Sequence, residues 1–183
     1  IKGEMPITEK FDCAGNSNYA CSKRLGELFL VKHALPWIIL RYGHLYGAGK
    51  VHHGLIGGYL SRIRIGQKPQ LFGNGENTND FAYVCDVAEA NYLALTAPWS
   101  SYQQIYNIGC GKELSSKRAG EIVCETFGWT GGVEEVASRD VDPQRFVYDL
   151  SKAKHMLGYE PKWMFEEGIA DMKIEMAKLG MPL

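Results

Sequence analysis

The sequence predicts an α/β fold, organised as one unit over 183 residues. Three observations support this class. Short segments rich in β-branched and aromatic residues alternate with segments whose apolar residues recur at helical spacing. No internal repeat or low-complexity tract interrupts the alternation. The composition, with 45% apolar and 22% charged residues, is that of an ordinary globular protein.

Each helix is predicted from capping and terminating residues as well as from its periodicity. The first is expected at 19–35, with Ser17 or Asn18 as N-cap and Pro36 closing it. Asp86 is expected to cap a later helix. The remaining helices are expected at 55–66, 86–97, 115–128, 151–158 and 165–180.

Strands are predicted where β-branched and aromatic residues cluster between turn signals. The segment "WIILRY" at 37–42 has the content of a buried strand, and the Gly- and His-rich segment 43–54 is expected to be a loop. The other strands are expected at 70–75, where a turn is included, and at 80–84, 104–109 and 145–150.

Charge, hydropathy and cysteine content exclude several functions. The 20 basic and 21 acidic residues give a net charge of −1, which predicts no nucleic-acid partner. The apolar runs are too short to span a membrane. Five cysteines without a CxxC pair predict reduced thiols and a cytoplasmic protein. The adjacent His52 and His53 have no carboxylate cluster beside them, so no metal site is expected.

The segment "NYACSK" at 18–23 contains the clearest candidate for chemistry. Residues four apart share one face of a helix, so Tyr19 and Lys23 are expected to project together. An ammonium group near a phenol favours the phenolate. Such a tyrosine can take a proton from an alcohol, or return one to a carbonyl, provided that a hydride acceptor is present.

Beyond this pair, six segments in order resemble the extended short-chain dehydrogenases/reductases, and specifically the NAD-dependent epimerase/dehydratase family. They are "PITE" (6–9), "YACSKRLGE" (19–27), "RYGHLYGAG" (41–49), "LFGNGENTNDFAYVCDVAEA" (71–90), "YNIGCGKELS" (106–115) and "DLSKAKHMLGYEPKWMFEEGI" (149–169). Each match is weak or moderate alone, but together they cover nearly the whole chain.

The resemblance implies the C-terminal part of an NAD(P)-binding Rossmann-type fold plus the smaller α/β substrate-binding lobe. Residues 1–50 would be the end of the Rossmann part with the catalytic helix, and 51–183 mostly the lobe. Tyr19 would be the acid/base, and Lys23 would bind the nicotinamide ribose. The implied cofactor is NAD, with NADP possible. The implied partners are a nucleotide-sugar substrate and, in the complete protein, a second copy in a homodimer.

Other positions of the motifs imply binding roles. Tyr42 and His44 would lie at the nicotinamide end, although packing is an alternative for Tyr42 and a plain loop role for His44. The substrate-binding candidates are His44, Phe72, Asn79, Arg139 and Phe146. Phe72 is equally compatible with a core position. His44 stands where the family often has Asn, and Asn79 stands where it usually has an arginine that grips the pyrophosphate.

No glycine-rich dinucleotide loop occurs between a strand and a helix, and the chain starts with Ile. We therefore expect a fragment that is inactive alone, from an enzyme that oxidises a sugar hydroxyl to a transient keto-sugar. Epimerisation is slightly favoured over dehydration. Two alternatives are a non-catalytic lobe that binds a sugar nucleotide and a reductase of the same superfamily that acts on a small carbonyl compound.

Overall fold

The computed structural model describes residues 5–11, 17–49, 54–138 and 144–181 and has the predicted α/β architecture. Its helices are α1 Asn18–Lys32, α2 Gly54–Arg64, α3 Val84–Leu95, the 3₁₀ helix η1 Trp99–Ser101, α4 Ser116–Phe127, α5 Ser151–Leu157 and α6 Phe165–Lys178. Its strands are β1 Ile38–Tyr42, β2 His44–Tyr46, β3 Gln70–Phe72, β4 Thr78–Tyr83, β5 Gln104–Ile108, β6 Glu113–Ser115 and β7 Glu134–Val136.

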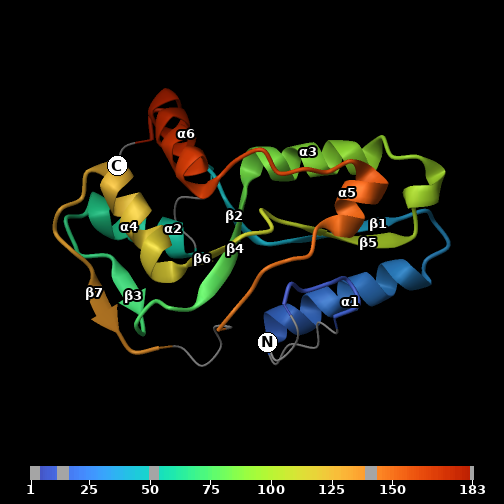
Figure 1. The fold of residues 1–183 in the computed structure, drawn as a ribbon, viewed down its shortest axis with the longest axis horizontal. Helices are drawn as coiled ribbons and strands as arrows, with labels where there is room; N and C mark the ends of the chain where they lie inside the picture. Colours follow the sequence, from blue (N-terminus) through green and yellow to red (C-terminus); the bar gives the residue numbers. More distant parts are fainter. Residues whose placement is uncertain (1–4, 12–16, 50–53, 139–143, 182–183) are drawn as a thin grey trace.

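One part of the molecule is built on the parallel pair β1–β5. Helix α3 packs on β1 and α5 on β5, on one face of this sheet, while α1 lies across the other face (Figure 1). The buried side chains between the sheet, α3 and α5 include Val87, Ala90, Tyr106, Ile108 and Leu157. Because a parallel sheet needs cover on both faces, this is the layering expected of such strands.

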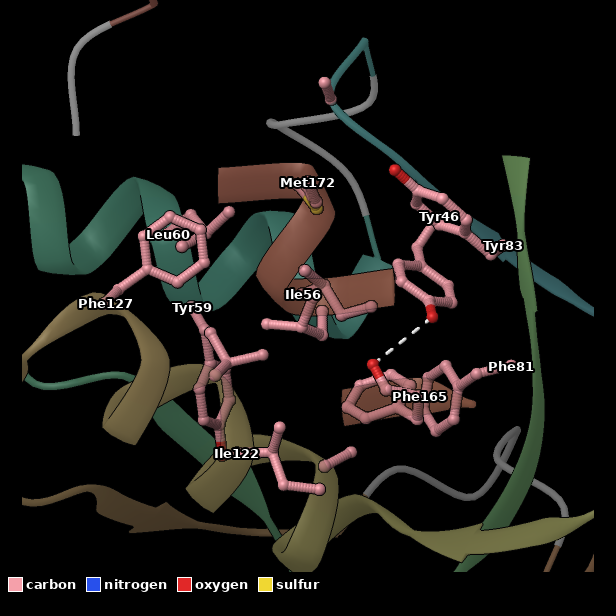
Figure 2. Close-up of a cluster of buried hydrophobic side chains, with 14 of the residues drawn as sticks. Tyr46, Ile56, Tyr59, Leu60, Phe81, Tyr83, Ile122, Phe127, Phe165 and Met172 are labelled. Atoms are coloured by element: carbon pink, nitrogen blue, oxygen red, sulfur yellow. Dashed lines mark hydrogen bonds between the residues drawn. The ribbon is translucent and has the colours of Figure 1, made fainter. Parts of the chain in front are cut away.

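The second part surrounds the mixed sheet β2–β4–β6 and the helices α2, α4 and α6. Figure 2 shows its core, in which the aromatic rings of Tyr46, Phe81, Tyr83 and Phe165 pack together. The hydroxyl of Tyr46 donates to the carbonyl oxygen of Phe165 at 3.4 Å. The parallel pair β3–β7 lies at the outer end of this part (Figure 1).

The chain passes between the two parts at Gly43, which separates β1 from β2. A Cβ at this position would lie 2.7 Å from the carbonyl oxygen of Asp80 in β4. Glycine therefore allows β4 to approach the backbone closely. Strand β5 pairs with β1, and α3 and α5 pack on that sheet, although all three lie beyond residue 50. The division of the chain near residue 50 stays a prediction.

Several elements differ from the sequence prediction. The segment 43–54 contains β2, and β6 and β7 were not predicted. The prediction of a strand at 145–150 is wrong. In this segment only Tyr148 pairs with another strand-like residue, in an isolated bridge to Ile7. Strands β6 and β7 and the bridge at Tyr148 form by pairing with segments that are distant in the sequence. Local propensity does not reveal such pairing. Helix α1 ends at Lys32, three residues before the predicted end.

The contact between α2 and α4 gives a first testable prediction. A Cβ on Gly120 of α4 would lie 2.5 Å from the ring of Tyr59, which is buried on α2. Gly120→Ala is expected to lower the free energy of unfolding by about 1–3 kcal/mol, because the core must move to accept one methyl group. Urea denaturation measures this.

Gly58, on α2, is the matched control. No atom lies within 4 Å of a Cβ built on it. Gly58→Ala is expected to raise stability by up to about 1 kcal/mol, the difference in helix propensity. Equal effects of the two substitutions would contradict the packing described here.

Candidate active site

Helix α1 presents the predicted acid/base pair on its surface. The hydroxyl oxygen of Ser17 accepts from the backbone N–H of Ala20 at 3.1 Å and caps the helix, as the sequence predicted. The Lys23 ammonium lies 5.4 Å from the centroid of the Tyr19 ring. The side chains are therefore neighbours, and Tyr19 is 71% exposed. Their catalytic and cofactor-binding roles stay predictions.

The position of α1 over the sheet is fixed by an ion pair that the sequence analysis did not identify. Arg41 of β1 donates from Nε and Nη2 to the two carboxylate oxygens of Glu27, both at 2.7 Å. Arg41 Nη1 also donates to the carbonyl oxygen of Glu9 at 3.1 Å. Since no α1 residue is buried, this bidentate pair is a principal link between the helix and the strand.

The same pair makes a pH-dependent contribution to stability. The hydrogen bonds from Arg41 hold the pKa of Glu27 below its ordinary value of 4.5, while burial opposes them. Because the folded-state pKa is lowered, the contribution is present above pH 4.5 and is lost as the pH falls through the folded-state value. Between pH 7 and pH 4 the free energy of unfolding should fall more for the wild type than for Glu27→Gln, by urea denaturation.

Glu121→Gln provides the control for this experiment. Glu121 forms an ion pair with Arg118 on α4, and both side chains are exposed. Exposed pairs contribute little, so this variant should keep the wild-type dependence on pH. If Glu27→Gln also keeps it, the pair does not stabilise the fold as described.

The structure brings together two of the predicted binding residues, His44 and Phe146. Their ring centroids are 5.5 Å apart in an edge-to-face arrangement. The His44 ring also lies 5.9 Å from Phe81, and Phe146 lies 4.9 Å from Tyr148. This aromatic group lies where β1 passes into β2. Aromatic rings of this kind can contact a ligand through their faces.

Tyr42 and Asn79 are used within the protein. The Tyr42 hydroxyl donates to Asn91 Oδ1 on α3 at 3.0 Å. Asn79 is 6% exposed, and its amide donates to Ser116 Oγ in the first turn of α4 at 3.2 Å. Asn79 has no charge, and its amide is hydrogen-bonded within the protein. Its substrate-binding role stays a prediction.

The last two candidates lie apart from the aromatic group or outside the described chain. Phe72 is on β3, beside β7, at the end of the molecule away from α1 (Figure 1). Arg139 lies outside the described residues, as do His52 and His53. Within the described ranges, no three His, Cys, Asp or Glu side chains gather as a metal ion requires.

Asp80 organises the segments around the aromatic group, and the sequence analysis did not identify this role. Its carboxylate accepts from the backbone N–H groups of Cys110, Gly111 and Tyr148 at 2.6, 3.1 and 3.2 Å. Burial raises the pKa of Asp80, and the three hydrogen bonds oppose that shift. The only available sequence signal was an acidic residue inside an otherwise buried strand.

The prediction for Asp86 is wrong. The residue lies within the first turn of α3, and its carboxylate accepts from the backbone N–H groups of Lys162 and Trp163 at 2.9 and 3.2 Å. It connects α3 to the segment that precedes α6. An aspartate that caps a helix and one that binds a distant segment cannot be told apart in the sequence, because both lie near the start of a helix.

The two-part α/β fold and the exposed Tyr-x-x-x-Lys helix define a protein of the short-chain dehydrogenase/reductase class. The family model "NAD dependent epimerase/dehydratase family" matches residues 2–109, and the chain belongs to this family. This confirms the resemblance and the fold class. In the part of the chain that the structure describes, no helix is both long enough and apolar enough to cross a membrane.

Among curated proteins, the chain is similar to a putative UDP-glucose 4-epimerase from Methanocaldococcus jannaschii, with 34% identity over 90% of this chain and 55% of that protein. It is also similar to a dTDP-glucose 4,6-dehydratase from an Actinoplanes species, with 29% identity over 86% of this chain and 50% of that protein. The chain thus spans about half the length of the curated relatives that it matches.

Similar solved structures include the same two kinds of enzyme. The UDP-glucose 4-epimerase from Thermotoga maritima, solved with UDP-glucose, has a TM-score of 0.80 and 28% identity over 88% of this chain and 53% of its own. A dTDP-glucose 4,6-dehydratase from Streptomyces venezuelae, solved with NAD, has a TM-score of 0.84 and 26% identity over 94% of this chain and 54% of its own.

Proposed function

We propose that this chain supplies the acid/base and part of the substrate site of an NAD-dependent nucleotide-sugar epimerase/dehydratase. The observation that carries the proposal is the adjacency of Tyr19 and Lys23 on the exposed side of α1. The similar proteins, which include UDP-sugar epimerases and dTDP-glucose dehydratases, support the substrate class and NAD.

The donor set on α1 fits the ribose end of a dinucleotide. A lysine ammonium and a tyrosine hydroxyl can both hydrogen-bond ribose hydroxyls, and both side chains reach solvent here. Lys23 and Tyr19 would hold that end, with Tyr42 and His44 nearer the strand end. When bound, NAD supplies the hydride acceptor that tyrosine chemistry requires.

Tyr19 would take the proton from a sugar hydroxyl as the hydroxyl carbon becomes a transient ketone, and would return it on reduction. Lys23, whose ammonium group lies beside the Tyr19 ring, would bind the nicotinamide ribose. The rings of His44 and Phe146 would contact the sugar or its phosphates, together with Arg139, while Phe72 would pack on the nucleotide base. Epimerisation is favoured slightly over dehydration.

The test uses this chain alone and co-expressed with the part of the Methanocaldococcus jannaschii relative that it does not match. NAD binding is measured by calorimetry, and the products formed from UDP-glucose and dTDP-glucose are identified. The proposal expects epimerised or dehydrated sugar in the co-expressed sample only. NAD binding without conversion of either sugar, by a sample with both segments folded, would overturn it.

A second candidate is a lobe that binds sugar nucleotides without turnover. The chain's span of about half of its relatives favours it. Binding of UDP-glucose to the chain alone, with no conversion in the co-expressed sample, would support this candidate over the enzyme.

A further inference from the structure

The segment 7–9, which precedes α1 in the chain, is hydrogen-bonded to the stretch that follows Phe146. The backbone N–H of Ile7 donates to the carbonyl oxygen of Val147 at 2.8 Å, and the N–H of Asp149 donates to the carbonyl oxygen of Ile7 at 2.8 Å. Phe146 of the aromatic group immediately precedes this bridge. The segment 7–9 is therefore attached to the stretch that carries one of the predicted substrate contacts.

The same segment is attached to the sheet under α1 by two residues that are directly paired, Arg41 on β1 and Asn107 on β5. Asn107 Nδ2 donates to the carbonyl oxygen of Ile7 at 2.9 Å, and its backbone N–H donates to Glu9 Oε1 at 2.9 Å. Arg41 Nη1 donates to the carbonyl oxygen of Glu9 at 3.1 Å, while its other two nitrogens hold Glu27 of α1. Two neighbouring side chains thus connect the segment to the helix.

The attachment of α1 at Glu27 determines where its acid/base pair points. Tyr19, Lys23 and Glu27 are spaced four residues apart and therefore follow one side of the helix. The planar guanidinium of Arg41 binds both carboxylate oxygens of Glu27, which restricts rotation of α1 about its axis. A continuous series of hydrogen bonds thus relates the direction of Tyr19 to the place of Phe146.

Asn107 lies at the centre of this series, and its side chain is incompletely paired. The residue is 0% exposed, and among the described residues its Oδ1 has no hydrogen-bond partner. The carbonyl oxygen of Ile7 would keep the N–H of Asp149 as donor if Asn107 were replaced. An unpaired buried oxygen costs stability, so the fold itself should tolerate an apolar side chain here. Such departures from full pairing are expected where function requires a particular geometry.

We propose that Asn107 is a positioning residue of the candidate active site. By fixing the segment 7–9 against the sheet, it holds α1, with Tyr19, at one distance and angle from the stretch that carries Phe146. It acts through Ile7 and Glu9. The proposal rests on the proposed function, because it assigns Asn107 to the same reaction. A misplacement of about 1 Å between reacting groups can lower a rate about 100-fold.

The test compares Asn107→Leu with the wild type, each co-expressed with the unmatched part of the Methanocaldococcus jannaschii relative and assayed with UDP-glucose and dTDP-glucose. Leucine has the branching of asparagine and the same number of side-chain heavy atoms, and it removes the donor to Ile7. We expect kcat to fall about 10- to 100-fold while KM changes less than about threefold, because each ligand contact is kept and only their relative placement is lost.

Ser101→Ala is the matched control. Ser101 is also 0% exposed, and its hydroxyl donates to the carbonyl oxygen of Met156 at 3.0 Å, before the start of β5. The substitution removes a buried hydrogen bond to the backbone, as Asn107→Leu does, but it should leave kcat and KM unchanged. A kcat that Asn107→Leu retains, or that Ser101→Ala lowers equally, overturns the proposal. If circular dichroism shows that Asn107→Leu does not fold, Asn107→Ser takes its place, since its hydroxyl is one atom shorter than the amide.

Hydrogen exchange of the chain alone separates this proposal from the proposed function. In the Asn107 variant, the amides of Ile7, of Asp149 and of α1 should exchange about tenfold faster or more, while Ser101→Ala keeps the wild-type rates there. Unchanged exchange at α1 overturns the proposal even where the assembly converts sugar. Faster exchange, in a chain whose wild-type assembly converts neither sugar, would refute the proposed function and still support Asn107 as the residue that holds α1 in place.

Discussion

Replacing Tyr19 by phenylalanine is expected to lower turnover by about 10²- to 10⁴-fold, the usual contribution of a positioned proton-transfer group. The sample is the co-expressed assembly described above, assayed with UDP-glucose and dTDP-glucose. Because Tyr19 is largely exposed and only its hydroxyl is removed, the melting temperature should not change. Lys23→Met should also lower turnover and, in addition, weaken the binding of NAD.

Tyr92→Phe is the control for this experiment. Tyr92 is a similarly exposed tyrosine on α3, and removing its hydroxyl should leave both turnover and NAD binding as they were. Retained turnover in Tyr19→Phe would refute the acid/base role. A parallel loss in Tyr92→Phe would show that the assay reports general damage to the assembly.

Asp80→Ala is expected to cause the largest loss of stability among the described residues that we consider. Asp80 is 0% exposed, and its carboxylate accepts from three backbone N–H groups. Removing it leaves those donors buried without their partner, at about 1–3 kcal/mol for each unsatisfied group. We expect the free energy of unfolding, measured in urea, to fall by about 3–5 kcal/mol in total, the upper range for single substitutions.

Asp149→Ala is the matched control. This partly exposed aspartate accepts from the nearby backbone N–H of Ser151 at 2.8 Å. Its removal should cost about 1 kcal/mol, as for the loss of a local cap. Asp80→Asn retains one acceptor oxygen and should fall between the two. If Asp80→Ala costs no more than Asp149→Ala, Asp80 does not hold the three segments together.

The sequence predicted the helices well because their signals are local. Ser17 caps α1, and Ser115 caps α4 by accepting from the N–H of Arg118 at 3.1 Å, both within one turn. The strands were predicted less completely. β7 pairs with β3, and β6 with β4, and in both cases the partner is more than 30 residues away. A three-residue strand has no periodicity of its own by which it could be recognised.

For the candidate site the same division holds. The sequence by itself determined that Tyr19 and Lys23 lie together, since a spacing of four on a helix fixes their relation. Only the tertiary structure decided that Glu27 meets Arg41 and that Asp86 reaches the backbone of Lys162. A carboxylate's sequence position does not identify its donor, because packing of distant segments brings the donor to it. The relation of His44 to Phe146, across 102 positions from β2, was settled in the same way.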